Sequence, residues 1–224
     1  MLKDSLLALV IVLASLMNAT AAERRIDTTD KPGNRVNLVT ARRLALEREA
    51  GGDVQFIGPI GVEGFNFARE VDLGKGLRAF VISCNLGGGL ILFDRSGEQI
   101  AAFRTWEVNY YQLFDFDDDG IFEIITEQRD GVGTGIAFWN FHIYSVSSHK
   151  IQETWEGESY YFDGNSRRLP IVRQGFIRCV PSNIEYPAPH LIHLSTDSIG
   201  RWLAERAFVL RGKSFVAVHL RPAA

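Results

Sequence analysis

The most chemically specific stretch of the chain is an acidic loop, 115–123, with the sequence Asp-Phe-Asp-Asp-Asp-Gly-Ile-Phe-Glu. Acids at its first, third and fifth positions can converge on one centre in a tight turn, and Gly120 permits the reversal. The seventh position can offer its carbonyl, and the acid at the ninth closes the shell. Hard oxygen ligands in this number suit Ca²⁺. We therefore predict one calcium site with these ligands: Asp115, Asp117, Asp119, the carbonyl of Ile121, and Glu123.

This loop departs from the EF-hand pattern. Its twelfth position is Thr126, where an EF-hand needs a bidentate Glu, and strand-like segments flank it instead of helices. Comparable turns at 72–76 and 163–166 hold glycine or serine in place of ligands, so we expect one site and not three. The alternative is an acidic turn that keeps an edge of the fold soluble without binding metal.

Other residues with chemical potential form weaker patterns. His190 and His193 are three apart, so on a strand they face opposite ways and are poorly placed to share a metal. His142 would share a strand face with Asn140, which favours a half-buried polar position. The glycine-rich stretch 131–135 leads into an aromatic strand, whereas a phosphate loop leads into a helix. No nucleophile-elbow sequence is present.

The elements that position these residues are predicted to be strands. From residue 53 onward, runs of Val, Ile, Phe, Tyr and Trp alternate with turn residues, which is typical of an all-β fold. A polar turn, a strand, a loop rich in Gly or Pro and a hairpin recur in this order three times. The turns begin at Asp72, Asp115 and Asp163, a spacing of about 40–50 residues that is typical of propeller blades.

We therefore predict that 53–224 form a propeller-like stack of three to four four-stranded antiparallel blades. A tail hairpin at 207–220 would complete the fourth sheet together with a strand near 54–57. A short helix is expected within 36–50, capped by Asn34 or Asn37. The alternatives are a single Greek-key sandwich, an open stack of blades, or closure of the ring by a second subunit.

The acidic loop and the strand that follows it resemble a known repeat. The pattern Asp-x-Asp-x-Asp-Gly-x-x-Glu entering Ile124-Ile125 is similar to the FG-GAP/VCBS repeat family, whose members form blades in integrin α-chain propellers and in many secreted bacterial proteins. The resemblance implies a calcium-binding β-propeller with the ligands named above. Members of the family range from adhesion proteins to carbohydrate-linked or lipid-linked enzymes, so the fold does not decide the function.

The N-terminal residues 1–22 read as a secretory signal peptide. Lys3 supplies a positive charge, 6–17 is apolar, and the small residues at 19–21 are typical of a cleavage site. A charged segment that contains the predicted helix follows at 23–52. We expect a secreted or periplasmic protein with no stable membrane insertion after cleavage. In that compartment Cys84 and Cys179 can form a disulfide, or they can remain buried thiols.

The signal peptide, the repeats and the acidic loop together favour a binding module as the first functional hypothesis. The 224 residues are 46% hydrophobic and 23% charged, with a net charge of −3, which excludes a disordered chain and gives no basic field for nucleic acid. We expect a non-catalytic, calcium-stabilised module that binds a protein or a glycan. The tyrosines of the pairs 110–111 and 160–161 are expected to be buried between blades, because aromatic residues dominate cores; the alternative is that the outward member of each pair stacks on a sugar or a peptide. One alternative is a structural subunit that closes a ring as a homodimer. The other is a secreted hydrolase with a site near the propeller axis, which would draw on these residues: His142, His190, His193 and His219.

Overall fold

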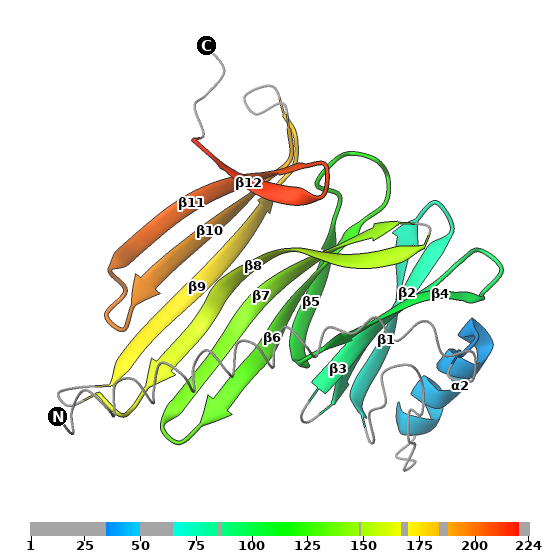
Figure 1. Cartoon of the computed structure of the whole chain (residues 1–224), viewed down its shortest axis with the longest axis horizontal. Helices are drawn as coiled ribbons and strands as arrows, with labels where there is room; N and C mark the ends of the chain where they lie inside the picture. The colour runs from blue at the N-terminus through cyan, green and yellow to red at the C-terminus, as the bar shows by residue number, and fades with distance from the viewer. Residues whose placement is uncertain are drawn as a thin grey trace, which may run out of the picture.

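A computed structural model describes residues 35–49, 65–84, 87–147, 149–166, 170–183 and 188–219. Within these ranges the chain forms one helix and twelve strands, β1–β12, arranged in two antiparallel sheets (Figure 1). The prediction of an all-β fold with a short N-terminal helix is thus confirmed. The predicted signal peptide, 1–22, and the predicted strand near 54–57 lie outside the described residues.

The first sheet contains four strands in sequential order. Its first turn, at 74–76, is built from residues with positive φ: Gly74 (85°), Lys75 (51°) and Gly76 (82°). A second turn is closed by Asp94, whose Oδ1 accepts hydrogen bonds from the backbone N of Ser96 at 2.9 Å and of Glu98 at 3.0 Å. The strands are β1 (Phe65–Gly74), β2 (Leu77–Cys84), β3 (Gly87–Phe93) and β4 (Gln99–Thr105).

The second sheet contains eight strands, again with each strand paired to its neighbours in the sequence. The chain passes directly from β4 in the first sheet to β5 in the second through Trp106. The strands are β5 (Glu107–Phe114), β6 (Glu123–Gly133), β7 (Ile136–Ser147), β8 (Lys150–Asp163), β9 (Ile171–Val180), β10 (His190–Asp197), β11 (Trp202–Arg211) and β12 (Ser214–Val218).

This eight-stranded sheet differs from the predicted separate blades. Strand β8 is 14 residues long. Its far end, from Tyr160 to Asp163, pairs with β9 from Gln174 back to Ile171, so the second and third repeats share one sheet. The tail hairpin forms as predicted, but β12 joins β11 at the end of this same sheet. The described strands therefore form a four-stranded and an eight-stranded meander and not a closed propeller or a Greek key.

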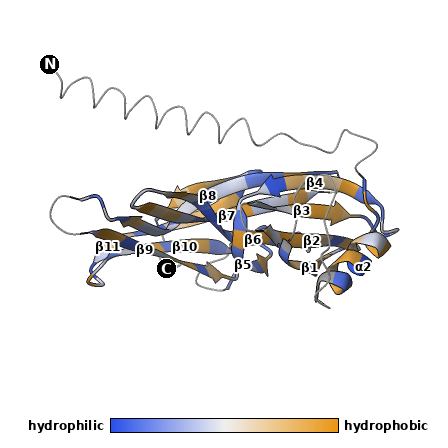
Figure 2. Ribbon diagram, turned by 90° about the horizontal axis from the view of Figure 1, so that it is seen from below, coloured by the Kyte–Doolittle hydropathy of each residue, from blue (hydrophilic) through white to orange (hydrophobic). Residues whose placement is uncertain are grey.

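The two central strands of the first sheet are buried on both faces, which explains the nearly unbroken apolar runs of β2 and β3 (Figure 2). One face packs under the helix, where Phe80, Ile82 and Phe93 contact buried helix residues. The other face packs on the second sheet, where Val81 and Leu92 belong to the same core cluster as residues of β5–β8. Another cluster lies among the eight strands and brings β5–β7 residues together with residues of β10–β12.

The helix, α2 (Leu38–Glu49), is fixed at its first turn. Asn37 Oδ1 accepts a hydrogen bond from Thr40 N at 2.8 Å, so Asn37 is the N-cap, one of the two residues predicted for that role. Leu38, at the start of the helix, is buried and donates its backbone N–H to Gly97 O at 2.9 Å. On the outer side, Arg42 makes two contacts of 2.6 Å with the carboxylate of Glu70 in β1. These contacts hold the helix on the first sheet.

Two further findings concern membrane spans and cysteines. Among the described residues, no helix is long and apolar enough to cross a bilayer. Cys84 and Cys179 form no disulfide; the first lies in β2 of the four-stranded sheet and the second in β9 of the eight-stranded sheet.

Candidate functional site

The acidic loop connects β5 to β6 and rests on the first turn of the other sheet. Phe122 N donates a hydrogen bond to Leu73 O at 2.9 Å. A Cβ at Gly74 would lie 2.3 Å from the carbonyl oxygen of Gly120, a separation that atoms do not tolerate. Glycine at position 74 therefore allows the two turns to touch, and the acidic loop is braced by a segment far from it in the sequence.

Three of the five predicted ligands converge. Asp115, Asp117 and Glu123 each offer a carboxylate oxygen, and these oxygens lie within 4.8 Å of one another. Asp119 is not part of this group, and its Oδ1 accepts a hydrogen bond from Ile121 N at 2.6 Å. The side chain of Ile121 packs against the core between the sheets.

Backbone hydrogen bonds hold the carboxylates in this arrangement. Asp115 accepts hydrogen bonds from Asp119 N at 3.1 Å and from Gly120 N at 2.8 Å. The loop turns through Asp118 and Gly120, which have φ values of 55° and 79°. The turn thus orders the acidic side chains before any ligand arrives.

Glu123 is the most deeply buried of the three acids. Its side chain is 4% exposed, and its Oε2 accepts a hydrogen bond from Phe116 N at 2.9 Å. Burial, together with the charges of Asp117 and Asp115, raises the pKa of Glu123 to about 7. Burial, and then the charge of Asp119, also raises the pKa of Asp117. A cation between these groups would relieve the repulsion that disfavours their charged forms.

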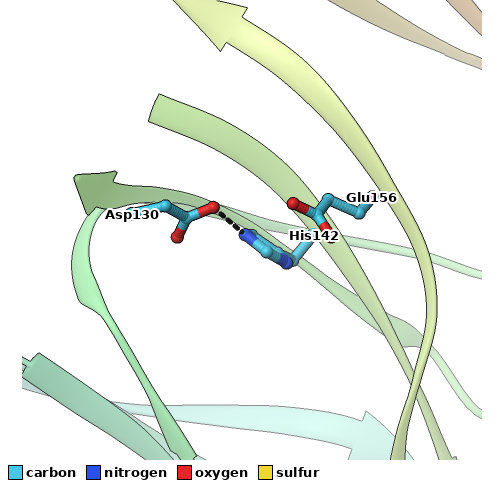
Figure 3. Close-up of side chains that lie close together, drawn as sticks. All are labelled: Asp130, His142 and Glu156. Carbon is cyan, nitrogen blue, oxygen red and sulfur yellow. Dashed lines mark hydrogen bonds and ion pairs between the residues drawn. The ribbon is translucent and has the colours of Figure 1, made fainter. Parts of the chain in front are cut away.

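A second polar cluster lies on the neighbouring strands β6, β7 and β8. Asp130, His142 and Glu156 come from one strand each and bring three ligand atoms within 4.8 Å of one another (Figure 3). The imidazole is 3% exposed, so His142 is buried more deeply than the half-buried position that we predicted. Alternation on β7 correctly placed Asn140 on the same face, but the partners from β6 and β8 could be found only once the strand register was known.

The His142 ring is contacted at both nitrogens. Nε2 lies 2.9 Å from Asp130 Oδ2, and Nδ1 lies 3.5 Å from Glu153 Oε2. Burial alone would lower the pKa of His142, but the hydrogen bond to Asp130 and the contact with Glu153 outweigh it and raise the pKa to about 9. In the metal-free protein at neutral pH the ring is therefore an imidazolium between carboxylates.

A bulge places two of the three glutamates of β8, Glu153 and Glu156, near this ring. His142 lies opposite Glu156, Ile143 opposite Trp155, and Tyr144 opposite Glu153, so Thr154 is an extra residue in β8. In a regular strand, residues 153 and 156, which are three apart, would face opposite sides of the sheet. The bulge at Thr154 puts them on the same face and so brings Glu153 to the cluster.

Glu153 also lines a cavity of about 240 Å³ between β4 and β8. Phe103 from β4 and Lys150 and Gln152 from β8 contribute to its wall. Glu153 is the lining residue that also contacts the His142 ring.

The other histidines make separate contacts. His193 Nε2 lies 2.8 Å from Glu158 O, and its ring faces Trp155 with centroids 5.5 Å apart. His190 is 1% exposed, with Nδ1 3.3 Å from Ala188 O. Neither belongs to the two carboxylate-containing groups found among the described residues.

The paired tyrosines have mixed environments. Tyr110 is 48% exposed, whereas Tyr111 packs against Phe67 with ring centroids 6.3 Å apart. Tyr160 stacks edge-on against Trp139 at 4.8 Å, and Tyr161 lies 4.4 Å from the guanidinium carbon of Arg173. Tyr110 is therefore the member of these pairs that is most available to a partner.

No protein-family model, curated protein or solved structure matches this chain.

Proposed function

We propose that the chain is an exported, calcium-stabilised β-repeat module that binds a protein or a glycan and has no catalytic role of its own. The observation that carries the calcium assignment is the convergence of Asp115, Asp117 and Glu123, with Glu123 buried and its pKa raised. A buried acid beside two further carboxylates is unfavourable without a counter-charge, and oxygen ligands on a tight turn suit Ca²⁺.

The loop is placed where a bound cation would affect the whole fold. It joins β5 to β6 and contacts the β1–β2 turn through Phe122 and Leu73. A cation bound there would stabilise the loop and, through it, the contact between the two sheets. We include the FG-GAP/VCBS resemblance in the proposal, because its nine-residue motif covers the same convergent acids.

Exposed aromatic side chains support a binding role. Tyr110 is 48% exposed and Trp202 is 67% exposed, so both can present a ring to a sugar or to a peptide. Export rests on the sequence of residues 1–22, and N-terminal sequencing of protein recovered from the periplasm or the medium tests it. A homodimer would be detected by light scattering, and a chain of monomeric mass would exclude it.

The calcium site is tested by titrating Ca²⁺ into metal-free protein by calorimetry. Wild type should bind one equivalent, and Asp117→Ala should bind none or much less. Asp94→Ala is a matched control, because Asp94 also caps an exposed turn with backbone hydrogen bonds but belongs to neither carboxylate group. Equal binding by wild type and Asp117→Ala would refute the assignment.

A further inference from the structure

We propose a second metal site, built from Asp130, His142 and Glu156, that takes a borderline divalent transition ion such as Zn²⁺. This site is independent of the calcium loop, because the two groups of side chains have no residue in common. One imidazole nitrogen and two carboxylates form a mixed nitrogen and oxygen donor set. Imidazole donors favour first-row transition ions, whereas Ca²⁺ takes oxygen ligands only.

The spacing of the donors fits such an ion. Bond lengths of about 2.0 Å in a tetrahedral zinc site put neighbouring ligand atoms about 3.3 Å apart. Here Nε2 of His142 and Oδ2 of Asp130 are 2.9 Å apart, and no pair of donors in the group exceeds 4.8 Å. Small side-chain adjustments therefore bring all three atoms to bonding distance, with a fourth position left for water.

The surrounding groups match the outer shell that metal-binding histidines use. A ligating imidazole usually directs its second nitrogen at a carboxylate, which sets the tautomer and the ring orientation. Nδ1 of His142 lies 3.5 Å from Glu153 Oε2, on the side of the ring away from Asp130; this is an ion-pair distance without a hydrogen bond, and a small approach of Glu153 would complete the outer contact. The extra residue in β8 lets that strand supply both a proposed ligand, Glu156, and this outer carboxylate.

Asn140 connects the two proposed carboxylate ligands. Its Nδ2 donates to Asp130 Oδ2 at 2.7 Å and to Glu156 Oε1 at 2.8 Å. One amide thereby contacts both acids that lie beside the ring. Such ordering of ligands by a neighbouring hydrogen-bond donor is what a metal site requires.

An unused buried oxygen gives independent support. The side chain of Asp130 is 8% exposed, and its Oδ1 is buried without a hydrogen-bond partner among the described residues. A buried carboxylate oxygen without a partner is costly. A metal bound by both oxygens of this carboxylate would use the lone pair of Oδ1, whereas the contact of His142 with Oδ2 alone leaves Oδ1 without a partner. Glu156 is exposed, which gives an ion access from solvent.

The test is the visible absorption of Co²⁺, which replaces Zn²⁺ in such sites, added to the purified full-length protein. Wild type should show the intense bands of a low-coordinate Co²⁺ site, and Zn²⁺ should abolish them. His142→Gln and Glu156→Gln should both lose the bands. Glu156→Gln is decisive if His142→Gln fails to fold, because residue 156 is exposed. His193→Gln is the matched control and should keep the wild-type spectrum.

An outer-shell variant separates a metal site from an ion-pair network. Glu153→Gln should weaken Zn²⁺ binding by about 10–100-fold while retaining the Co²⁺ bands. Asp117→Ala should leave the Co²⁺ spectrum intact, so failure of the calcium proposal and failure of this one are distinguishable. Absence of bands in wild type, or bands that survive in both His142→Gln and Glu156→Gln, would overturn the proposal.

Discussion

Replacing Glu123 by glutamine should have opposite effects on stability with and without calcium. The carboxyl is 4% exposed, and its pKa of about 7 lies above the 4.5 of an ordinary glutamic acid. In the folded state it therefore holds a proton that the unfolded chain releases near pH 4.5. The stability contributed by this proton is complete below about pH 4.5 and is lost as the pH rises through about 7.

The magnitude follows from that difference in pKa. Ionising Glu123 in the metal-free fold costs about 3 kcal/mol of unfolding free energy once the pH is above 7. Glutamine removes the cost but keeps an oxygen that can accept from Phe116 N, so part of the 2.9 Å hydrogen bond is retained. After allowing about 1 kcal/mol for the weaker neutral hydrogen bond, Glu123→Gln should be more stable than wild type by about 2 kcal/mol in EGTA.

Denaturant unfolding at pH 7.5 and pH 5, in EGTA and in CaCl₂, measures both effects. At pH 5 the gain in EGTA should fall below about 1 kcal/mol, because wild-type Glu123 is then protonated in the fold. In CaCl₂ the variant should gain nothing, while wild type gains about 2.7 kcal/mol at a hundred times its Kd. Glu205→Gln, an exposed acid on β11, is the control and should change neither value. A variant that is destabilised in EGTA and still responds to calcium would refute the reasoning.

Three further predictions concern the contacts around the sites. Gly74→Ala should cost more than about 2 kcal/mol, because it adds a Cβ against a carbonyl of the acidic loop; Gly200→Ala, with a similar φ of 77° and open space, should cost about 1 kcal/mol or less in the same denaturant series. The pKa of Glu70 is lowered, first by its hydrogen bond to an arginine of α2, so this acid stabilises above its unfolded pKa and the contribution is lost as the pH falls through the folded value. Glu70→Gln should therefore lower the unfolding free energy by about 1 kcal/mol or less at pH 7 and by nothing at low pH. Unfolding of both proteins across an acid pH series measures this difference, and a difference that persists at low pH would contradict the reasoning. Burial raises the pKa of Cys179 to about 12, so native protein should react with a thiol reagent at pH 8 far more slowly than unfolded protein; equal rates would show that this thiol is not protected.

The local features of the fold were predictable from sequence. The acidic loop is recognisable in the sequence by its acids at alternate positions and its glycine, and Gly120 has the expected positive φ of 79°. The turn between β3 and β4 was likewise readable from Asp94 to Gly97, and Asn37 was readable as a helix cap. These signals depend on residues within a few positions of one another.

Long-range pairing was not predictable in the same way. Repeat similarity indicated separate blades, yet the end of β8 pairs with β9 and merges two repeats into one sheet. No local pattern distinguishes a strand that ends a blade from one that continues into the next, because both have the same alternation. The bulge at Thr154 also has no recognisable sequence signal, although it places Glu153 and Glu156 on the strand face that carries His142.

The exact ligand set of the acidic loop is a further point that spacing leaves open. Asp119 Oδ1 accepts a hydrogen bond from Ile121 N at 2.6 Å, and its other oxygen stays available as the ligand that the spacing predicts. Side chains in a turn can bond to their own backbone, so spacing alone does not decide which carboxylate oxygens face a common centre.

The most direct test of the central proposal is the thermal unfolding of the purified protein in excess CaCl₂ and in EGTA, compared for wild type and Asp117→Ala. The proposal predicts that calcium raises the wild-type Tm by about 5–10 °C at a hundred times Kd, and that Asp117→Ala shows no shift. Asp94→Ala should retain the wild-type response. An unchanged wild-type Tm, or an equal shift in wild type and Asp117→Ala, would contradict the assignment of calcium to the loop at 115–123.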